Sequence, residues 1–259
     1  MGKWKGLFRR EWLLYHSWIW GFILAIVVTI FLVSAGIAKV FGLEENYLDI
    51  ALILTAIWIF AQCFVVTTQF CMSLNQDAKR TDVWLHTPAT TNQLLSAKIM
   101  FSSVFTIIVL LVTEIIGIIL LVVNNDMELG AILQLGTVIF MLFALNSLFS
   151  FVVVLLFWIF YMKIKPFTGN FAGFITVIVG ITVTALWSNM MGLTWVKKWT
   201  NIMEIPAATV QRILPKIKEV PGTMEIQPVY IGSFLFYAIV TILFYVIALK
   251  WFDRGVEQR

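Results

Sequence analysis

The segment from Leu94 to Val123 reads LLSAKIMFSSVFTIIVLLVTEIIGIILLVV, with one Lys near its start and one Glu in its second half. An α-helix rises 1.5 Å per residue, so about 20 apolar residues cross the roughly 30 Å of hydrocarbon in a bilayer. The segment is longer than that, and a lone strand would leave its backbone polar groups unsatisfied in lipid. We therefore expect a transmembrane helix that tilts or extends past the membrane.

Five further apolar runs lie along the chain: Trp18–Ala38, Leu48–Met72, Ala131–Tyr161, Phe171–Gly192 and Tyr230–Leu249. Hydrophobic residues make up 61% of the 259 residues and charged residues 12%, against about 45–50% and 25% in soluble domains. A soluble domain of this size cannot bury so much apolar surface, so the surplus must face lipid. We predict an all-α integral membrane protein with six transmembrane helices and a single domain, residues 1–259.

Lys and Arg residues indicate the orientation, because they are enriched in cytoplasmic segments. With the N-terminus inside, twelve of the 18 Lys and Arg residues fall on the inner side. Five of the six outer ones lie in one longer loop, residues 193–229. The short outer loops are acidic, with Glu44, Glu45, Asp126 and Glu128. We predict that both termini lie in the cytoplasm.

Residues 1–17 form a basic segment with an apolar face. The residues of this face recur at spacings of three and four: Trp4, Leu7, Phe8, Trp12 and Tyr15. Lys5 and Arg9 fall on other faces, so we expect an amphipathic helix that lies in the headgroup region. Two interpretations stay open: an ordinary basic anchor before the first span, and an elbow helix that touches a cytoplasmic partner.

The inner loop, residues 73–93, reads SLNQDAKRTDVWLHTPATTNQ. The loop contains the apolar sequence Val83-Trp84-Leu85, which is unusual in a solvated linker. We therefore predict a short amphipathic helix that presents an aromatic side chain to a partner. A Trp-anchored interfacial loop is the alternative. Pro88 ends this stretch, and Thr91 or Asn92 is expected to cap the next span.

The outer loop, residues 193–229, also contains an amphipathic stretch. Pro206 can open a short helix, and Pro215 would kink or end it early. Its apolar face would consist of Val210, Ile213, Leu214 and Ile217. We expect an extracellular interfacial or re-entrant segment, either packed on the membrane surface or acting as a lid over a pathway.

Glu114 is the one acidic residue deep inside an expected span. An ionisable group at membrane depth is rare and becomes a functional candidate. Gln62, Gln69 and Asn146 are further polar candidates. These four residues either form hydrogen bonds between helices or line a translocation path.

The chain lacks four common sequence motifs of nucleotide-binding, metal-binding and catalytic sites. It has no GxxxxGK[ST] phosphate loop, no HExxH, no GxSxG and no CxxC. Cys63 and Cys71 are eight residues apart, about 12 Å along a helix, which exceeds disulfide reach. We expect no catalytic site, metal or cofactor in this chain, and no nucleic-acid partner.

The order of these segments along the chain is similar to that of a known protein family. A basic start (KWKGLFRREWLLY) precedes two spans, then an inner loop with DAKRTDVWLHTPATTNQLLSAK, four more spans and a short charged tail. This layout resembles the permease subunits of ABC-2 type transporters, especially small six-span ones from Gram-positive bacteria. In that family the loop often carries an acidic residue, a Leu-x-x-x-Pro-like stretch and a Lys that opens the third span, matched here by Asp77, Leu85, Pro88 and Lys98.

The resemblance implies a multi-pass protein of the bacterial cytoplasmic membrane with several partners. These are a second permease, identical or related, and separate ATP-binding cassette subunits that hold ATP and Mg²⁺. It also implies that the first inner loop couples to a cassette through Asp77, Lys79, Arg80, Asp82, Trp84 and Leu85. The implied elbow helix contributes Trp4, Phe8, Arg9, Arg10 and Glu11.

The function expected from this resemblance is export of hydrophobic or amphipathic substrates, such as antimicrobial or toxin peptides or drugs. The tentative translocation path comprises Glu114, Gln62, Gln69 and Asn146. A secondary carrier, a membrane anchor or immunity protein that acts by binding, and an intramembrane enzyme are the alternatives.

Overall fold

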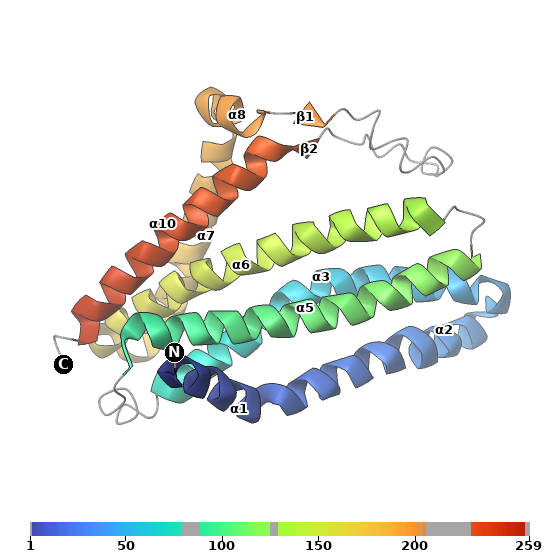
Figure 1. The fold of residues 1–259 in the computed structure, drawn as a ribbon, viewed down its shortest axis with the longest axis horizontal. Helices are drawn as coiled ribbons and strands as arrows, with labels where there is room; N and C mark the ends of the chain where they lie inside the picture. Colours follow the sequence, from blue (N-terminus) through green and yellow to red (C-terminus); the bar gives the residue numbers. More distant parts are fainter. Residues whose placement is uncertain (1, 79–88, 125–128, 203, 206–228, 257–259) are drawn as a thin grey trace. The chain divides into compact units, whose positions relative to one another are not determined.

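The computed structural model describes residues 2–78, 89–124, 129–202, 204–205 and 229–256 (Figure 1). The chain divides into two compact units, Met1–Phe151 and Val152–Arg259. Helices dominate the described residues, which confirms the predicted helical fold class.

One long helical run opens the first unit. Helix α1 (Gly2–Val27) continues through a π-helical segment, η1 (Val28–Val33), into α2 (Ser34–Phe41). The run ends at Gly42, whose φ of +65° is a left-handed conformation that glycine adopts without strain. There the Leu43 N–H donates to Ala38 O at 2.8 Å, which completes a Schellman motif.

The amphipathic segment predicted for residues 1–17 is part of this run. Helix α1 passes Ser17 and Trp18 without a break, so the segment and the first apolar run form one helix. The aromatic face packs against a helix of the same unit, where Phe8 and Trp12 each lie 6.2 Å from Phe101 between ring centroids. The expected position in the headgroup region stays a prediction.

Two more long helices pack beside the first run. A short 3₁₀ segment, η2 (Glu44–Asn46), leads into α3 (Tyr47–Ala78), and α5 spans Thr91–Asn124. The N-cap of α5 is Thr90, not the predicted Thr91 or Asn92. Thr90 and Gln93 exchange hydrogen bonds of 3.2 and 3.3 Å, which form a capping box.

Contacts between side chains give the helix directions in the first unit. Helices α3 and α5 run antiparallel, since Asp77 pairs with Lys98 at one end and Asp49 with Asn124 at the other. Helix α1 runs parallel to α5, because Trp4 bonds to Ser96 and Phe22 packs on Phe105. The N-terminal end of α1, the end of α3 and the start of α5 therefore meet (Figure 1).

Helix α6 (Leu129–Thr168) begins in the first unit and ends in the second. In the first unit its Phe143 packs on Phe60 of α3, with ring centroids 5.5 Å apart. A 3₁₀ turn, η3 (Gly169–Phe171), joins α6 to α7 (Ala172–Met191). A Cβ atom at Gly180 of α7 would lie 3.9 Å from Phe157 of α6, so the two helices fold back on each other.

The rest of the second unit holds α8 (Thr194–Thr200), two short strands and α10 (Ile231–Val256). Strands β1 (Glu204–Ile205) and β2 (Val229–Tyr230) pair antiparallel. Gly232 lets α10 begin against α8, because a Cβ there would lie 2.7 Å from Thr200 O. The helix predicted from Pro206 lies outside the described residues.

Five helical stretches of the described chain are long and apolar enough to cross a membrane: Trp4–Phe41, Glu44–Asp77, Thr91–Asn124, Gly136–Met191 and Gly232–Phe252. The fourth contains most of α6 and all of α7. Many large apolar side chains on these stretches are exposed, for example Phe64 at 78%, as lipid-facing residues would be. The structure thus supports a multi-pass membrane protein.

Candidate functional site

Four charged side chains meet where α1, α3 and α5 come together. Glu11, Asp77 and Lys98 are at most 3% exposed, while the Arg10 side chain is 31% exposed. Lys98 Nζ lies 2.9 Å from Glu11 Oε1 and 2.9 Å from Asp77 Oδ2. The Arg10 guanidinium pairs with the other Asp77 oxygen, Oδ1. We call these four residues the buried charge cluster.

Lys98 is the centre of the cluster. Its ammonium group donates to Glu11 Oε1, to Ser73 Oγ at 2.6 Å and to Ser73 O at 3.2 Å. The contact with Asp77 Oδ2 is an ion pair without hydrogen-bond geometry. The Ser73 hydroxyl in turn donates to Glu11 Oε2 at 2.8 Å. All three protons of the ammonium group therefore have acceptors nearby.

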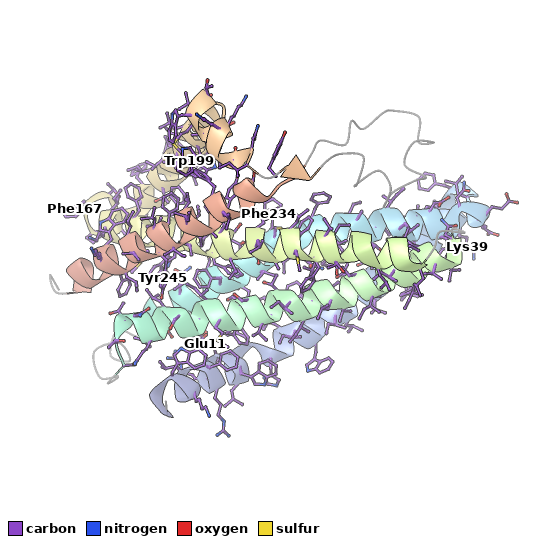
Figure 2. All side chains as sticks on the ribbon, turned by 45° about the horizontal axis from the view of Figure 1, so that its top comes forward. Glu11, Lys39, Phe167, Trp199, Phe234 and Tyr245 are labelled. Carbon is purple, nitrogen blue, oxygen red and sulfur yellow. The ribbon has the colours of Figure 1, made fainter. Side chains whose placement is uncertain are left out.

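The formal charges of the cluster cancel, with two cations and two anions. A buried charge is tolerated only when it is paired and hydrogen-bonded, and both conditions hold here. Because the partners are 67 and 87 residues apart along the chain, the cluster joins three helices that sequence separates. Figure 2 shows Glu11 on the side of α1 that faces α5.

Aromatic and polar contacts surround the cluster. The Tyr15 hydroxyl donates to Gln76 Oε1 at 2.5 Å, and the Trp4 indole N–H donates to Ser96 Oγ at 3.3 Å. The Tyr15 ring also lies 6.0 Å from Phe101. These contacts fix the start of α1 to the end of α3 and to the start of α5. The end of α3 and the start of α5 are thus both in contact with α1.

Of the predicted coupling residues, the structure describes only Asp77, which belongs to the buried charge cluster. Asp77 is buried and paired inside the chain, so its predicted contact with a cassette would require the cluster to open. The other predicted coupling residues lie outside the described residues: Lys79, Arg80, Asp82, Trp84 and Leu85.

The predicted elbow residues divide into two groups. Arg10 and Glu11 belong to the buried charge cluster, while Arg9 is exposed. Trp4 stacks on Phe8 with ring centroids 5.9 Å apart. Arg9 is therefore open to the surroundings, whereas Arg10 and Glu11 hold α1 against α3 and α5.

The predicted path residues on α3 point at α5. Gln62 Nε2 donates to Thr113 Oγ1 at 2.5 Å, and the Ser102 hydroxyl donates to Gln69 Oε1 at 3.0 Å. Both glutamines are at most 3% exposed. This geometry favours hydrogen bonding between helices over the lining of an open path.

Asn146 and Glu114 occupy different surroundings. Asn146 is exposed on α6, with its amide 3.8 Å from Cys63 Sγ. Glu114 is 9% exposed on α5, and its Oε1 has no hydrogen-bond partner among the described residues. Gln62 Oε1 and Gln69 Nε2 are likewise without partners there. Several buried polar atoms of α3 and α5 therefore lack hydrogen-bond partners among the described residues.

Sequence reasoning missed the central role of Lys98 and the contributions of Ser73, Tyr15 and Gln76. One signal was available. Polar residues recur every seven positions on α3, at Thr55, Gln62, Gln69 and Gln76. A spacing of seven places residues on one face of a helix. That face contacts α5 in the structure, and Gln76 contacts α1.

The described residues offer little for a cofactor. No group of three or more His, Cys, Asp or Glu among them is placed to hold a metal ion. An open groove on α1 is lined by Ser17, Trp18, Gly21, Phe22 and Ala25, and it supplies one side-chain hydroxyl. The contacts seen at the buried charge cluster are ion pairs and hydrogen bonds between α1, α3 and α5.

The chain was compared with protein families, curated proteins and solved structures. No family model matches the chain, and no curated protein or solved structure matches it.

Proposed function

We propose that the chain is the transmembrane permease subunit of an ABC exporter, and that it works with a separate ATP-binding cassette subunit and a second permease. The buried charge cluster is the observation that carries this proposal. It holds the N-terminal helix and both flanks of the 79–90 connection together. Force applied to that connection by a partner would therefore reach α1, α3 and α5 at once.

The proposal includes six spans with both termini on the inner side. The stretch Gly136–Met191 has 56 residues, about 84 Å of helix if straight, while one crossing needs about 30 Å. Gly169, with a φ of +54°, turns the chain between α6 and α7. The contact of Gly180 with Phe157 supports two crossings, α6 and α7, in place of one.

The proposed substrate class rests on the resemblance to ABC-2 type permeases and on the amino-acid composition of the chain. We propose hydrophobic or amphipathic substrates, peptides or drugs, which pass between two permeases. The abundance of Phe in the chain, 22 residues, fits such substrates. The buried pairing of Gln62 and Gln69 with α5 is consistent with a path between subunits, because these side chains are occupied inside this one.

Co-purification tests whether the chain binds a separate ATP-binding cassette subunit. Tagged chain extracted from its native membrane in mild detergent should retain an ATP-hydrolysing subunit. If no ATPase is retained at any detergent tested, the proposal is wrong.

The Trp84→Asp variant tests the coupling loop. Placing a charge on the one aromatic side chain of the loop should weaken a docking contact made through it, so ATP hydrolysis should no longer respond to substrate. The matched control is Trp195→Asp, since Trp195 is 57% exposed on α8, outside that loop. Substrate-stimulated ATPase activity of the purified complex is the measurement. Wild-type stimulation in Trp84→Asp would remove the coupling role.

A further inference from the structure

A π-helical segment, η1, interrupts the first long helical run between α1 and α2. Such segments add about one residue to a helical turn, are rare in proteins and are frequent at functional sites. Side-chain hydroxyls bind the carbonyl groups of η1. The Ser34 hydroxyl donates to Ile30 O and, at 3.2 Å, to Phe31 O, and the Tyr47 hydroxyl donates to Phe31 O at 3.5 Å. The π-helical conformation is therefore supported by contacts on either side of it.

The extra residue of η1 keeps one face of the run buried. Ile26, Ile30, Ser34 and Ala38 are at most 3% exposed, and they follow one another at intervals of four. In a regular α-helix each residue turns the chain by about 100°, so Ala38 would lie about 120° away from Ile26. When η1 takes up one residue, that angle falls to about 20°. The buried face of α1 thus continues into α2 because of η1.

The two ends of the run are held in different ways. Arg10 and Glu11 hold the N-terminal end through the ion pairs of the buried charge cluster. The other end is held by the chain itself, because Gly42 and η2 lead from α2 directly into α3. Figure 2 labels Glu11 near the first end and Lys39 near the second. A change inside η1 would therefore move α1 and leave α2 in place.

The effect of such a change follows from helix geometry. If η1 became α-helical, α1 would rotate by about 100° and shift by about 1.5 Å, so that residue i+1 would take the place of residue i. Arg10 would then occupy the exposed position of Arg9, and Glu11 the partly exposed position of Arg10. Asp77 and Lys98 would stay paired, since they belong to α3 and α5. The cluster would open without leaving an unpaired buried charge.

We propose that η1 is a register switch in the first apolar helix. In the register of the structure η1 is π-helical and the buried charge cluster is closed, and in the second register the whole run is α-helical and the cluster is open. Rotations and shifts of helices by 1–2 Å are established elements of conformational switching. Both registers are properties of this chain alone, so the inference stands or fails independently of the proposed permease function.

The rotation of α1 can be measured as a distance between two spin labels. Leu13 of α1 is 62% exposed, and Met72 of α3 is 44% exposed. Met72 directly precedes Ser73, which contacts Glu11, so the two labels lie at a similar height. On a helix with a diameter of roughly 10–12 Å, a rotation of about 100° moves the outer side-chain atoms by about 8 Å. The two registers should therefore give two separate distances.

Pulsed electron paramagnetic resonance on the full chain in lipid vesicles provides the measurement. The labelled variant carries Leu13→Cys and Met72→Cys and lacks Cys63 and Cys71. In this background the distance of the structure should dominate. Val40→Cys with Met72→Cys is the control pair, because Val40 is exposed on α2 and should stay in place.

Two further changes move the equilibrium in opposite directions. Arg10→Gln with Glu11→Gln removes the hold of the cluster on α1 and keeps the pair of Asp77 with Lys98, so a second distance should be added to the first. Deletion of Leu32, which is 67% exposed, removes the extra residue and gives the buried face the regular spacing i, i+4, i+7, i+11. Combined with the two Gln substitutions, this deletion should abolish the second distance. The control pair should give one distance throughout.

Deletion of Ile107 is the matched control for the deletion of Leu32, because Ile107 is also exposed and α5 is a regular α-helix. It should lower the unfolding temperature by turning one half of α5 away from α3, whereas deletion of Leu32 should not lower it. A single distance in the Arg10→Gln, Glu11→Gln variant would overturn the inference, and so would one broad distribution, which indicates fraying of α1. It would also be overturned by a second distance that survives deletion of Leu32, or by a loss of stability equal to that caused by deletion of Ile107.

Discussion

Lys98 bridges the two carboxylates of the buried charge cluster. Its ammonium group touches both carboxylates and Ser73 within 3.2 Å. Removing one partner of a buried ion pair leaves an uncompensated charge, which destabilises a protein by about 3–5 kcal/mol. The Lys98→Met variant should therefore unfold at a lower temperature than the wild type, measured on purified protein in detergent.

A second variant separates charge from packing. Glu11→Gln combined with Lys98→Met leaves Arg10 and Asp77 as a neutral pair, so the double variant should be more stable than Lys98→Met alone. Lys5→Met is the control, because Lys5 is exposed and forms no ion pair with the described residues. Equal stability of the single variant and the wild type would refute the central role of Lys98.

Thr113 and Glu114 are adjacent but should respond differently to substitution. Thr113 accepts the hydrogen bond of Gln62 Nε2, so Thr113→Val should leave a buried donor unpaired and destabilise the protein by about 1–3 kcal/mol. Glu114 has an oxygen without a partner, and Glu114→Gln replaces an acid by a neutral amide that is easier to bury. The Gln variant should be at least as stable as the wild type. A loss of stability in Glu114→Gln would show that its carboxyl group has a partner beyond the described residues.

At the level of elements, the register of α3 on α5 is the feature to test. Four contacts define this register, and in them the residue numbers fall along α3 while they rise along α5. The pairs are Ser73 with Lys98, Gln69 with Ser102, Gln62 with Thr113, and Asp49 with Asn124. Cysteines at Gln69 and Ser102, in a chain without Cys63 and Cys71, should be joined by a short thiol crosslinker. Cysteines at Gln69 and Thr113 should not, because Thr113 lies about 16 Å further along α5. Gel mobility reports both results, and crosslinking of the second pair alone would contradict this register.

The helices themselves were predictable from sequence, because apolar runs of 20 or more residues have no other stable form in lipid. The continuity of α1 was not. The resemblance implies Arg10 and Glu11 only as elbow-helix residues, and their partners, Asp77 and Lys98, lie in distant segments. Pairing over such separations leaves no local pattern. The polar face of α3 did leave one, its spacing of seven, but that spacing does not identify the helix it contacts.

At the scale of the whole molecule, the number of crossings decides where the termini lie. Six crossings place both termini on one side of the membrane, and five place them on opposite sides. The two counts differ only in whether Gly136–Met191 crosses twice or once. The exposed turn residue Asn170 and the exposed Glu45 between α2 and α3 are suitable reporters.

Single cysteines at these positions, in a chain without Cys63 and Cys71, should label from opposite sides with a membrane-impermeant maleimide. We expect Glu45→Cys to react in intact cells, and Asn170→Cys to react only in inverted vesicles. A reporter fused after Arg259 should be cytoplasmic, because α7 and α10 then add one crossing each. An extracellular reporter together with an unreactive Asn170→Cys would mean that Gly136–Met191 crosses once. The turn between α6 and α7 would then be inside the membrane, and the proposed six-span permease would be wrong.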